Sequence, residues 1–418
     1  MKIAKILAPG FFTLLASSCV PDMAFAQVVS NAQVWVGSWA ASQQIPEPQN
    51  ALPADDLRDA TVREVVHLSI GGTRLRVHVS NAFGTGPLYF TSVHIARPTS
   101  PASMTIDAGW DRALTFSGAT DVIVPAGAEY ISDPIDYFVG PLSNIAVSFH
   151  LDAPPAQETS HPGSRATTYY VHGNMVSAAN LIGAQHVDHW YQLSGIDVLV
   201  PAGAASIVAL GDSITDGHGA TTNGNDRWTD ILAERLQASP ATRNIGVLNQ
   251  GIGGNHVLTD GLGPNALARF DRDVLAQPDV HWLIVFEGVN DLGGLTRTSE
   301  VSAAEHTALV SRILSAYEQI IVRAHDHGIR VIGATITPYS GSDYYHPGPA
   351  NEADRQAINA WIRTAGHFDD VLDFDKVVRD PDHPDRLATM DDCGDHLHPN
   401  SAGYRAMGSA IPLTLFVH

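Results

Sequence analysis

Cysteine is almost missing from this sequence, and positively charged residues are few. The 418 residues include two cysteines. There are 24 Lys and Arg residues but 44 Asp and Glu residues, which gives a formal net charge of −20. If Cys19 is removed with an N-terminal signal, Cys393 alone remains, so no intramolecular disulfide can form and packing must supply the stability. The negative charge argues against nucleic acid or an anionic membrane surface as a partner. Internal repeats, low-complexity tracts and long charge runs are absent from the sequence.

The N-terminal segment 1–26 has the pattern of an export signal. Two lysines precede an apolar stretch at 6–20, and Ala24-Phe25-Ala26 fits a small-x-small cleavage site. We therefore expect a mature chain that begins near Gln27 and is exported, either periplasmic or secreted. A membrane span is disfavoured because proline, glycine and serine interrupt the stretch, which is shorter than the roughly 20 residues a span needs. A second hypothesis is a lipoprotein anchor at Cys19, although alanine stands three residues earlier, where a larger aliphatic residue is usual.

Residues 33–200 predict an all-β domain. Apolar and polar residues alternate with period two in several segments, for example around Leu75, Val77 and Val79, and turn-rich clusters separate these segments. Gly71-Gly72 lies between two such runs and predicts a two-residue hairpin, because both glycines tolerate positive φ. The spacing favours a β-sandwich that resembles a jelly roll.

The pattern changes near residue 201, where a second domain, 201–418, is predicted. Apolar runs alternate there with amphipathic helices, which is typical of a parallel sheet covered on both faces. A long helix is expected over 302–327, with a capping box from Ser302 and Glu305 and an end at Gly328. The expected buried strands are Ser206–Leu210, Ile245–Leu248, His281–Phe286, Arg330–Ile336 and Val371–Phe374. This predicts an α/β fold, a flavodoxin-like three-layer α/β/α domain with a five-stranded parallel sheet.

Four short blocks in the second domain can each supply one part of a serine ester hydrolase. They are Gly211-Asp212-Ser213-Ile214-Thr215, Asn249 to Asn255, Gly288-Val289-Asn290-Asp291 and Asp395-His396-Leu397-His398-Pro399. Acyl transfer by a hydroxyl needs a base, a carboxylate that orients the base, and donors aimed at the developing oxyanion. Thr215 stands two residues after the serine, so the Gly-x-Ser-x-Gly elbow of the large α/β-hydrolase group is absent.

These blocks, in this order, resemble the SGNH, or GDSL-like, hydrolase family, with its four signature positions at Ser213, Gly254, Asn290 and His398. The resemblance covers about 204–411 and implies that Ser213 is the nucleophile, His398 the base and Asp395 its orienting partner. It also implies an oxyanion hole made of the backbone N–H groups of Ser213 and Gly254 and the side chain of Asn290. The N-terminal β domain lies outside the minimal family fold, and its place ahead of the GDSL-like domain resembles an exported type of esterase.

Several of these residues also have structural interpretations. Gly-Asp-Ser can cap a helix, the glycine-rich block can be a tight turn, and Asn290 can be a helix cap. His396 competes with His398 for the role of base, but spacing favours His398. The pairs His396/His398 and His325/His327 can suggest a metal site, yet no set of tetrahedral ligands is apparent, and we expect neither a metal nor a cofactor. Cys393 is expected to be a partly buried filler, and His256 and Glu287 to be structural residues near the pocket.

The sequence therefore predicts a cofactor-independent, exported serine esterase. We expect it to act on short-chain carboxylic esters, with O-acetyl groups of carbohydrate as the favoured small-molecule or polysaccharide substrate. One alternative is a lipase or lysophospholipase acting on longer acyl chains. Another is a glycan-binding protein with a relic hydrolase domain. Several aromatic residues of the β domain could either stack on sugar rings or pack in the core. They are Tyr89, Phe90, Tyr169, Tyr170, Trp190 and Tyr191.

Overall fold

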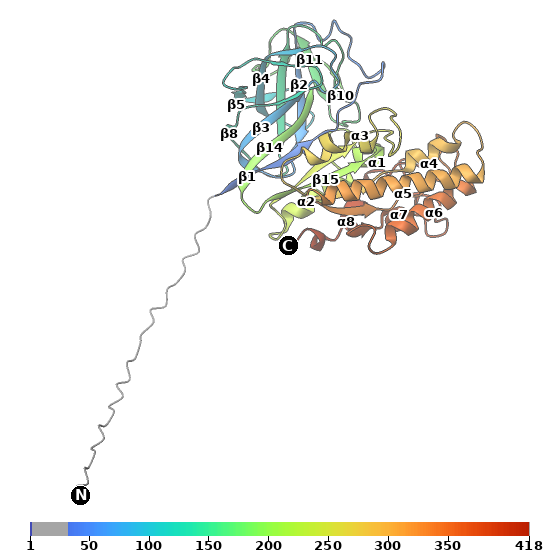
Figure 1. Ribbon diagram of the computed structural model, residues 1–418. Helices are drawn as coiled ribbons and strands as arrows, with labels where there is room; N and C mark the ends of the chain where they lie inside the picture. The colour runs from blue at the N-terminus through green and yellow to red at the C-terminus, as the bar shows by residue number, and fades with distance from the viewer. Residues whose placement is uncertain (2–31, 418) are drawn as a thin grey trace.

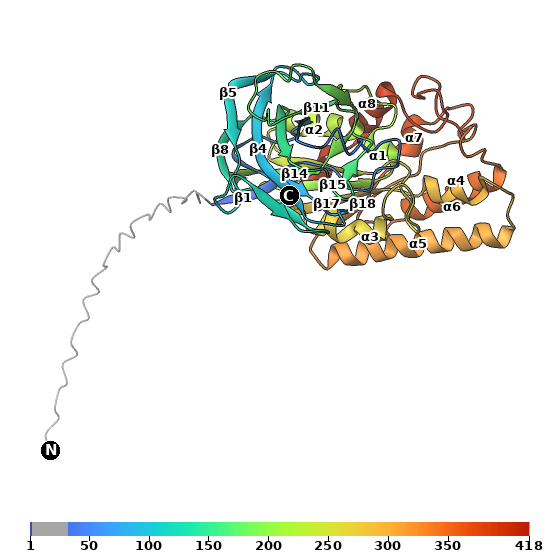
Figure 2. The same cartoon turned by 90° about the horizontal axis from the view of Figure 1, so that it is seen from above.

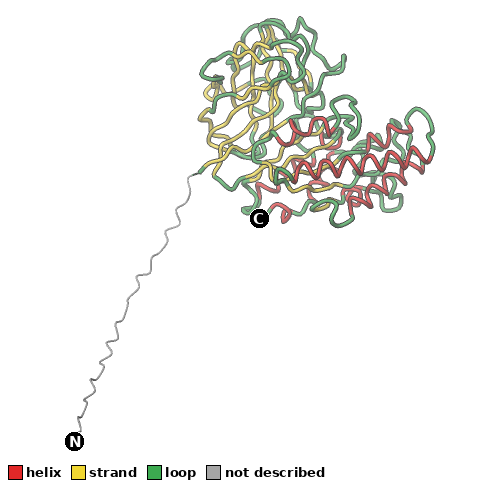
Figure 3. Tube along the Cα trace, viewed as in Figure 1, coloured by secondary structure: helices red, strands yellow, loops and turns green. Residues whose placement is uncertain are grey.

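The computed structural model describes Met1 and residues 32–417. The predicted signal peptide and Cys19 therefore lie, apart from Met1, outside the described residues. Strands dominate the N-terminal half of the described chain, and helices alternate with strands in the C-terminal half (Figure 3). No helix in the described part is long and apolar enough to cross a membrane.

The N-terminal half is a sandwich of antiparallel sheets that enclose a common apolar core (Figure 1). The five-stranded sheet contains β1 (Gln33–Ala40), β14 (Leu193–Pro201), β3 (Gly72–Ser80), β7 (Glu129–Ile131) and β8 (Ile135–Val139). The seven-stranded sheet contains β12 (Gln185–Val187), β11 (Thr168–His172), β2 (Ala60–His67), β9 (Asn144–Leu151), β4 (Leu88–Pro98), β5 (Ile106–Ala113) and β6 (Val122–Val124). A short pair, β10 (Ser160–His161) and β13 (Trp190–Tyr191), lies beside them.

The hairpin predicted at Gly71-Gly72 is wrong. Strands β2 and β3 flank this dipeptide but belong to different sheets, so the chain crosses the sandwich here. A side chain at Gly71 would meet the backbone of Val139 and Pro141 at under 3 Å, which explains the need for glycine. Two glycines between alternating strands suit a crossover as well as a hairpin, and local sequence does not separate the two.

Most of the aromatic residues singled out in the β domain are core residues. Phe90, Tyr170, Trp190 and Tyr191 are buried. Trp190 packs edge-on against Trp39, with ring centroids 4.8 Å apart. Sugar stacking is therefore excluded for these four in the folded domain.

The C-terminal half contains the predicted five-stranded parallel sheet, with strand order β16-β15-β17-β18-β19. Its strands are β15 (Ala205–Gly211), β16 (Ile245–Gly251), β17 (Val280–Phe286), β18 (Arg330–Ala334) and β19 (Asp370–Leu372). In chain order this is 2-1-3-4-5, the order of flavodoxin-like sheets. The fold class predicted from the sequence is confirmed.

Helices cover both faces of this sheet, and Figure 2 shows α5 on one side with α2 and α8 on the other. The helices are α1 (Ser213–Asp216), α2 (Trp228–Ala238), α3 (Ala266–Phe270), α4 (Val289–Thr296), α5 (Ala303–His325), α6 (Pro349–Arg363), α7 (Phe374–Val378) and α8 (Ser401–Ala410), with a π turn at Asp271–Leu275 and a 3-10 turn at Leu413–Phe416. The capping box predicted for α5 is present, since Ser302 and Glu305 bond each other's backbone N–H. Gly328, beyond its end, has φ 72°.

The β domain docks directly on the parallel sheet through its first strand and the segment between β2 and β3. The Gly37 N–H donates to Ser206 Oγ at 3.2 Å, and the Val247 N–H donates to Ser69 Oγ at 2.9 Å. A side chain at Gly37 would collide with Leu248, so glycine permits the close approach. Ala40 is part of the C-terminal core. The two halves thus share a packed, hydrogen-bonded boundary.

Candidate active site

Three loops meet at the carboxyl edge of the parallel sheet because their strands are neighbours. Gly211 at the end of β15 is in register with Gly251 on β16 and with Phe286 on β17. Ser213, Gly254 and Asn290 follow these three positions within a few residues. Ligands of open α/β sheets bind at this edge.

Ser213 is the first residue of α1, and its hydroxyl contacts an imidazole. Asp212 caps this short helix by accepting from the Ile214 N–H at 2.9 Å. Ser213 Oγ lies 2.8 Å from His398 Nε2. Both side chains are buried, with the residues 7% and 8% exposed, so the contact is largely shielded from water.

The other nitrogen of His398 faces Asp395. Nδ1 lies 2.6 Å from Asp395 Oδ2, while Oδ1 accepts from the backbone N–H groups of Leu397 and His398. Partial burial of Asp395 opposes ionisation, but the hydrogen bonds from His398 and the backbone outweigh it and hold the Asp395 pKa well below its usual range. Asp395 is therefore a carboxylate that accepts Nδ1–H and leaves Nε2 free to accept from Ser213 Oγ.

His396, the alternative base, points elsewhere. It has φ 60°, and its Nδ1 lies 2.6 Å from Asp392 Oδ2. Its side chain is more than half exposed. The left-handed backbone at His396 helps to direct the two imidazoles of this block to different sides.

The two backbone N–H groups expected in the oxyanion hole have no hydrogen-bond partner in the described chain. Neither the Ser213 N–H nor the Gly254 N–H donates a hydrogen bond within residues 32–417. Gly254 has φ 67°, and a side chain there would lie 3.0 Å from Leu262, so the site needs glycine. Unpaired, partly shielded N–H groups can stabilise an oxyanion.

The Asn290 side chain is held at both ends. Its Nδ2 donates to the Asn255 carbonyl at 2.6 Å, and its Oδ1 accepts from the Tyr345 hydroxyl at 2.6 Å. One Nδ2 hydrogen then remains for a ligand, because an amide nitrogen carries two. Tyr345 lies in the loop before α6 and belongs to no recognisable motif, so this contact could not be predicted from sequence patterns.

Arg269, which is 1% exposed, ties the loops together beneath Ser213. It donates to the Gly211 carbonyl at 2.9 Å, to Asn255 Oδ1 and to Glu287 Oε1. Burial raises the pKa of Asp212 to about 7, and burial with the nearby Asp212 raises the pKa of Glu287 well above its usual range. Glu287 is 1% exposed, and its expected structural role stays a prediction.

His256 lies on the loop that carries Gly254. Its ring faces Gly261, where a Cβ would lie 3.0 Å from His256 Nδ1. This buried Nδ1 has no hydrogen-bond partner in the described chain.

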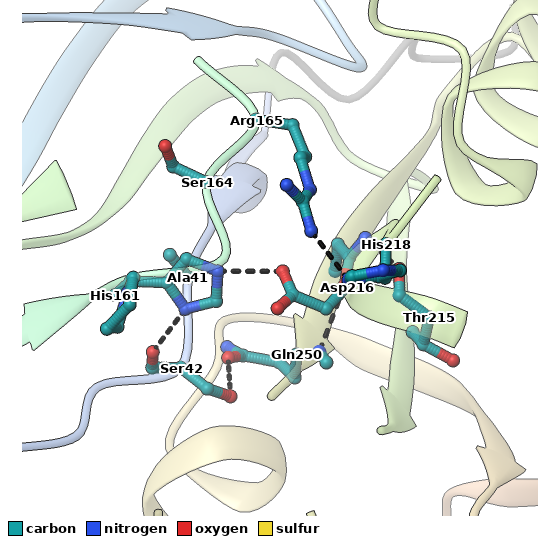
Figure 4. Close-up of polar contacts among 12 residues, drawn as sticks. Ala41, Ser42, His161, Ser164, Arg165, Thr215, Asp216, His218 and Gln250 are labelled. Carbon is teal, nitrogen blue, oxygen red and sulfur yellow. Dashed lines mark hydrogen bonds and ion pairs between the residues drawn. The ribbon is translucent and has the colours of Figure 1, made fainter. Parts of the chain in front are cut away.

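The β domain reaches the same loops with two side chains, as Figure 4 shows. His161 Nε2 lies 2.9 Å from Asp216 Oδ1, and both residues are buried. Arg165 donates to His218 Nδ1 at 2.8 Å. His218 in turn packs on His398, with ring centroids 4.0 Å apart. No motif marked His161, Arg165 or His218, because each of them meets a partner more than 50 residues away in the sequence.

One group of metal-capable side chains occurs in the described part of the chain: His218, Cys393, Asp395 and His398. Arginine has only donors, so the bond from Arg165 requires a lone pair on His218 Nδ1 and leaves hydrogen on Nε2. In this arrangement His218 offers no lone pair to an ion. His325 instead contacts Asp369, and His327 contacts the Arg323 carbonyl.

Cys393 is exposed, so its expected role as a partly buried filler is wrong. Desolvation of the sulfur by neighbouring groups and the adjacent Asp395 nevertheless raise the pKa of its thiol to about 11. A protonated thiol is a poor nucleophile.

A comparison with protein-family models identifies the class of the C-terminal half. Residues 209–406 match the model of the GDSL-like Lipase/Acylhydrolase family. No curated protein sequence matches the chain.

Three solved structures illustrate the likeness. An acetyl xylan esterase is 21% identical with a TM-score of 0.37, covering 49% of this chain and 96% of its own. The M. smegmatis aryl esterase in its inhibitor-bound form is 18% identical with a TM-score of 0.37, covering 50% and 96%. A GDSL-like lipase from Bacteroides thetaiotaomicron VPI-5482 is 17% identical with a TM-score of 0.36, covering 50% and 87%.

The family match defines the second domain as a GDSL-like acylhydrolase domain. The protein is accordingly a carboxylic ester hydrolase, as the four sequence blocks predicted. The β-sandwich is a separate domain that lies outside the matched residues.

Proposed function

We propose that the protein is an exported serine esterase that removes short acyl groups, acetyl above all, from carbohydrate through an acyl-enzyme. One observation carries the catalytic part: the Ser213 hydroxyl lies 2.8 Å from His398 Nε2, and His398 Nδ1 lies 2.6 Å from the Asp395 carboxylate. A hydroxyl, an imidazole and a carboxylate in this sequence of contacts form the triad arrangement.

In the first step Ser213 Oγ attacks the ester carbonyl carbon while His398 Nε2 takes the hydroxyl proton. The carbonyl π electrons move to oxygen, and the N–H groups of Ser213 and Gly254 with the free Nδ2 hydrogen of Asn290 stabilise the oxyanion. Collapse of this intermediate breaks the bond to the alcohol, which receives the proton from His398. Water then repeats the sequence on the acyl-Ser213 ester, which releases the acid and restores the hydroxyl.

The polar surroundings of the triad support a polar alcohol such as a sugar. His218, Arg165 and Asp395 lie on one side of His398, and two of them are ionic groups. A long alkyl chain on this side would desolvate charges without compensation. Export is supported by the signal pattern of residues 1–26 alone.

The test compares hydrolysis of p-nitrophenyl acetate with that of the dodecanoate, and measures acetate released from acetylated polysaccharides. We expect the protein to hydrolyse the acetate ester faster than the dodecanoate ester and to release acetate from the polysaccharides. The Ser213→Ala variant serves as the negative control. Faster hydrolysis of the dodecanoate would favour the lipolytic alternative and contradict the proposed substrate. The signal is tested separately by sequencing the N-terminus of protein recovered outside the cytoplasm, which we expect near Gln27.

A further inference from the structure

In addition to the docking contacts of Gly37 and Ser69, the β domain contacts the catalytic domain through residues 160–167, which we call the clamp. Its backbone is bonded to the loop after α1: the Asn223 N–H donates to the Arg165 carbonyl at 2.8 Å, and the Thr167 N–H donates to Asn223 Oδ1 at 2.9 Å. The Arg227 guanidinium also donates to the Ser164 carbonyl. Arg165 and Asn223 both have positive φ, at 49° and 61°. Such strained backbone persists where surrounding contacts fix it.

The clamp places the Arg165 guanidinium against His218. Its terminal nitrogen lies 2.8 Å from His218 Nδ1 (Figure 4). Because arginine stays protonated and only donates, Nδ1 must accept, so His218 is neutral with its hydrogen on Nε2. The Tyr404 hydroxyl, which donates to the His218 carbonyl at 2.6 Å, fixes the backbone of this residue.

His218 in turn lies against the base of the triad. Its ring centroid is 4.0 Å from that of His398, with the planes inclined at 39°. Its Nε2 lies 3.7 Å from Asp395 Oδ2. The protonated nitrogen of His218 therefore approaches the carboxylate that already orients His398.

The charged and titratable groups around His218 come from several segments. Arg165 belongs to the clamp, Asp216 to α1, and Cys393, Asp395 and His398 to the loop before α8. Burial, His398 and Arg165 lower the pKa of His218 to about 4, while Asp395 and Asp216 oppose them. The pKa direction agrees with the tautomer that the Arg165 contact requires.

We propose that Arg165 is a positioning residue of the esterase, supplied by the β domain, which keeps His218 neutral and directed at Asp395 beside His398. This inference rests on the proposed function, in which His398 becomes an imidazolium during each proton transfer. A second imidazolium in ring contact would repel that charge and weaken His398 as a base. The β domain thus completes the active site.

The proposal is tested with Arg165→Gln, Arg165→Lys, His218→Gln and the double variant Arg165→Gln/His218→Gln. Arg112→Gln, an exposed arginine on β5 of the same domain, is the matched control. The full chain is used throughout, and thermal unfolding checks that each variant is folded. The readout is kcat/KM for p-nitrophenyl acetate as a function of pH on the acid side.

We expect the acid limb of the wild-type kcat/KM profile to follow one protonation. In Arg165→Gln, His218 is no longer held neutral and titrates as well, so the slope of the acid limb increases towards two protonations. The ratio of kcat/KM at pH 5.5 to that at pH 8 is therefore expected to be ~5- to 10-fold lower in this variant than in the wild type. The double variant, which has no imidazole at 218, returns to one protonation. Arg165→Lys keeps a cationic donor, so its acid limb is expected to have a slope between those of the wild type and Arg165→Gln. The profile of Arg112→Gln is expected to match the wild type. An Arg165→Gln profile parallel to the wild type, or a double variant that keeps the steeper limb, overturns the proposal.

A second readout needs no catalysis. The imidazole C–H resonances of His218 are titrated by NMR in the Ser213→Ala background, with and without Arg165→Gln. We expect His218 to stay neutral above pH 5 with arginine and to titrate nearer the ordinary histidine value, about 6.5, with glutamine. Identical titration in the two proteins overturns the proposal. Failure of the esterase assignment is distinguishable, because it appears as ester hydrolysis that survives Ser213→Ala.

Discussion

The Tyr345 hydroxyl donates a 2.6 Å hydrogen bond to Asn290 Oδ1, across 55 residues of sequence. The opposite end of the same amide donates to the Asn255 carbonyl. Together these contacts determine the orientation of the Asn290 amide, that is, the positions of its oxygen and nitrogen. They also fix the direction of the second Nδ2 hydrogen, which has no partner in the described chain. A donor that is aimed before the reaction costs no reorganisation when the oxyanion forms.

Loss of the Tyr345 hydroxyl should weaken this aim. We expect Tyr345→Phe to lower kcat for p-nitrophenyl acetate by about 10-fold with little change in KM, because the amide contacts the oxyanion and not the ground-state ester. Steady-state kinetics at pH 8 provide the measurement. Tyr344→Phe, on the exposed neighbouring tyrosine, is the matched control. A KM effect with unchanged kcat would contradict the positioning role.

Removal of the amide itself should cost more. Asn290→Ala is expected to lower kcat by about 10²- to 10³-fold, the usual effect of losing one oxyanion donor. In this background Tyr345→Phe should have almost no further effect on kcat, since the two residues act as one unit. Additive losses in the double variant would show that Tyr345 acts elsewhere.

A further prediction concerns the pH dependence of the stability of the β domain. His78 is buried between two carboxylates, with Nε2 2.8 Å from Asp197 and Nδ1 3.1 Å from Glu129. Burial alone would lower its pKa, but Asp197 and Glu129 overcome this and raise the pKa of His78 to about 9. The folded pKa lies above the unfolded one, so the stabilisation is complete below about pH 6.5 and is lost as pH rises through about 9.

The measurement is the difference in free energy of unfolding between the wild type and His78→Gln, from urea titrations at several pH values. We expect this difference to shrink by about 3 kcal/mol between pH 6 and pH 10, following the shift in pKa. A difference that stays constant with pH would show that His78 is not protonated in the folded domain.

The parts of the fold that the sequence predicts are those with local signals. The five strands of the parallel sheet are continuous apolar runs, and α5 carries its cap at Ser302 and Glu305. Asp395 and His398 were predicted as a unit because they are three residues apart. In contrast, Gly71-Gly72 has the same local pattern in a hairpin and in a crossover, and only the partners of β2 and β3 decide between them.

The residues around the triad that the sequence did not predict make contacts between distant segments. Arg165 meets His218 across the domain boundary, and Tyr345 meets Asn290 from another loop. Neither tyrosine nor arginine in a loop has a spacing that reports its partner. Such contacts follow from how the β-sandwich docks on the parallel sheet, which no short motif encodes.

The central claim is that Ser213 and His398 act together as nucleophile and base. The most direct measurement is kcat for p-nitrophenyl acetate in Ser213→Ala, His398→Ala and the double variant, with circular dichroism to verify folding. We predict that each single variant loses about 10⁵- to 10⁶-fold and that the double variant loses no more than either, since the pair acts as a unit. Activity near the wild-type level in a folded Ser213→Ala or His398→Ala protein would contradict the account.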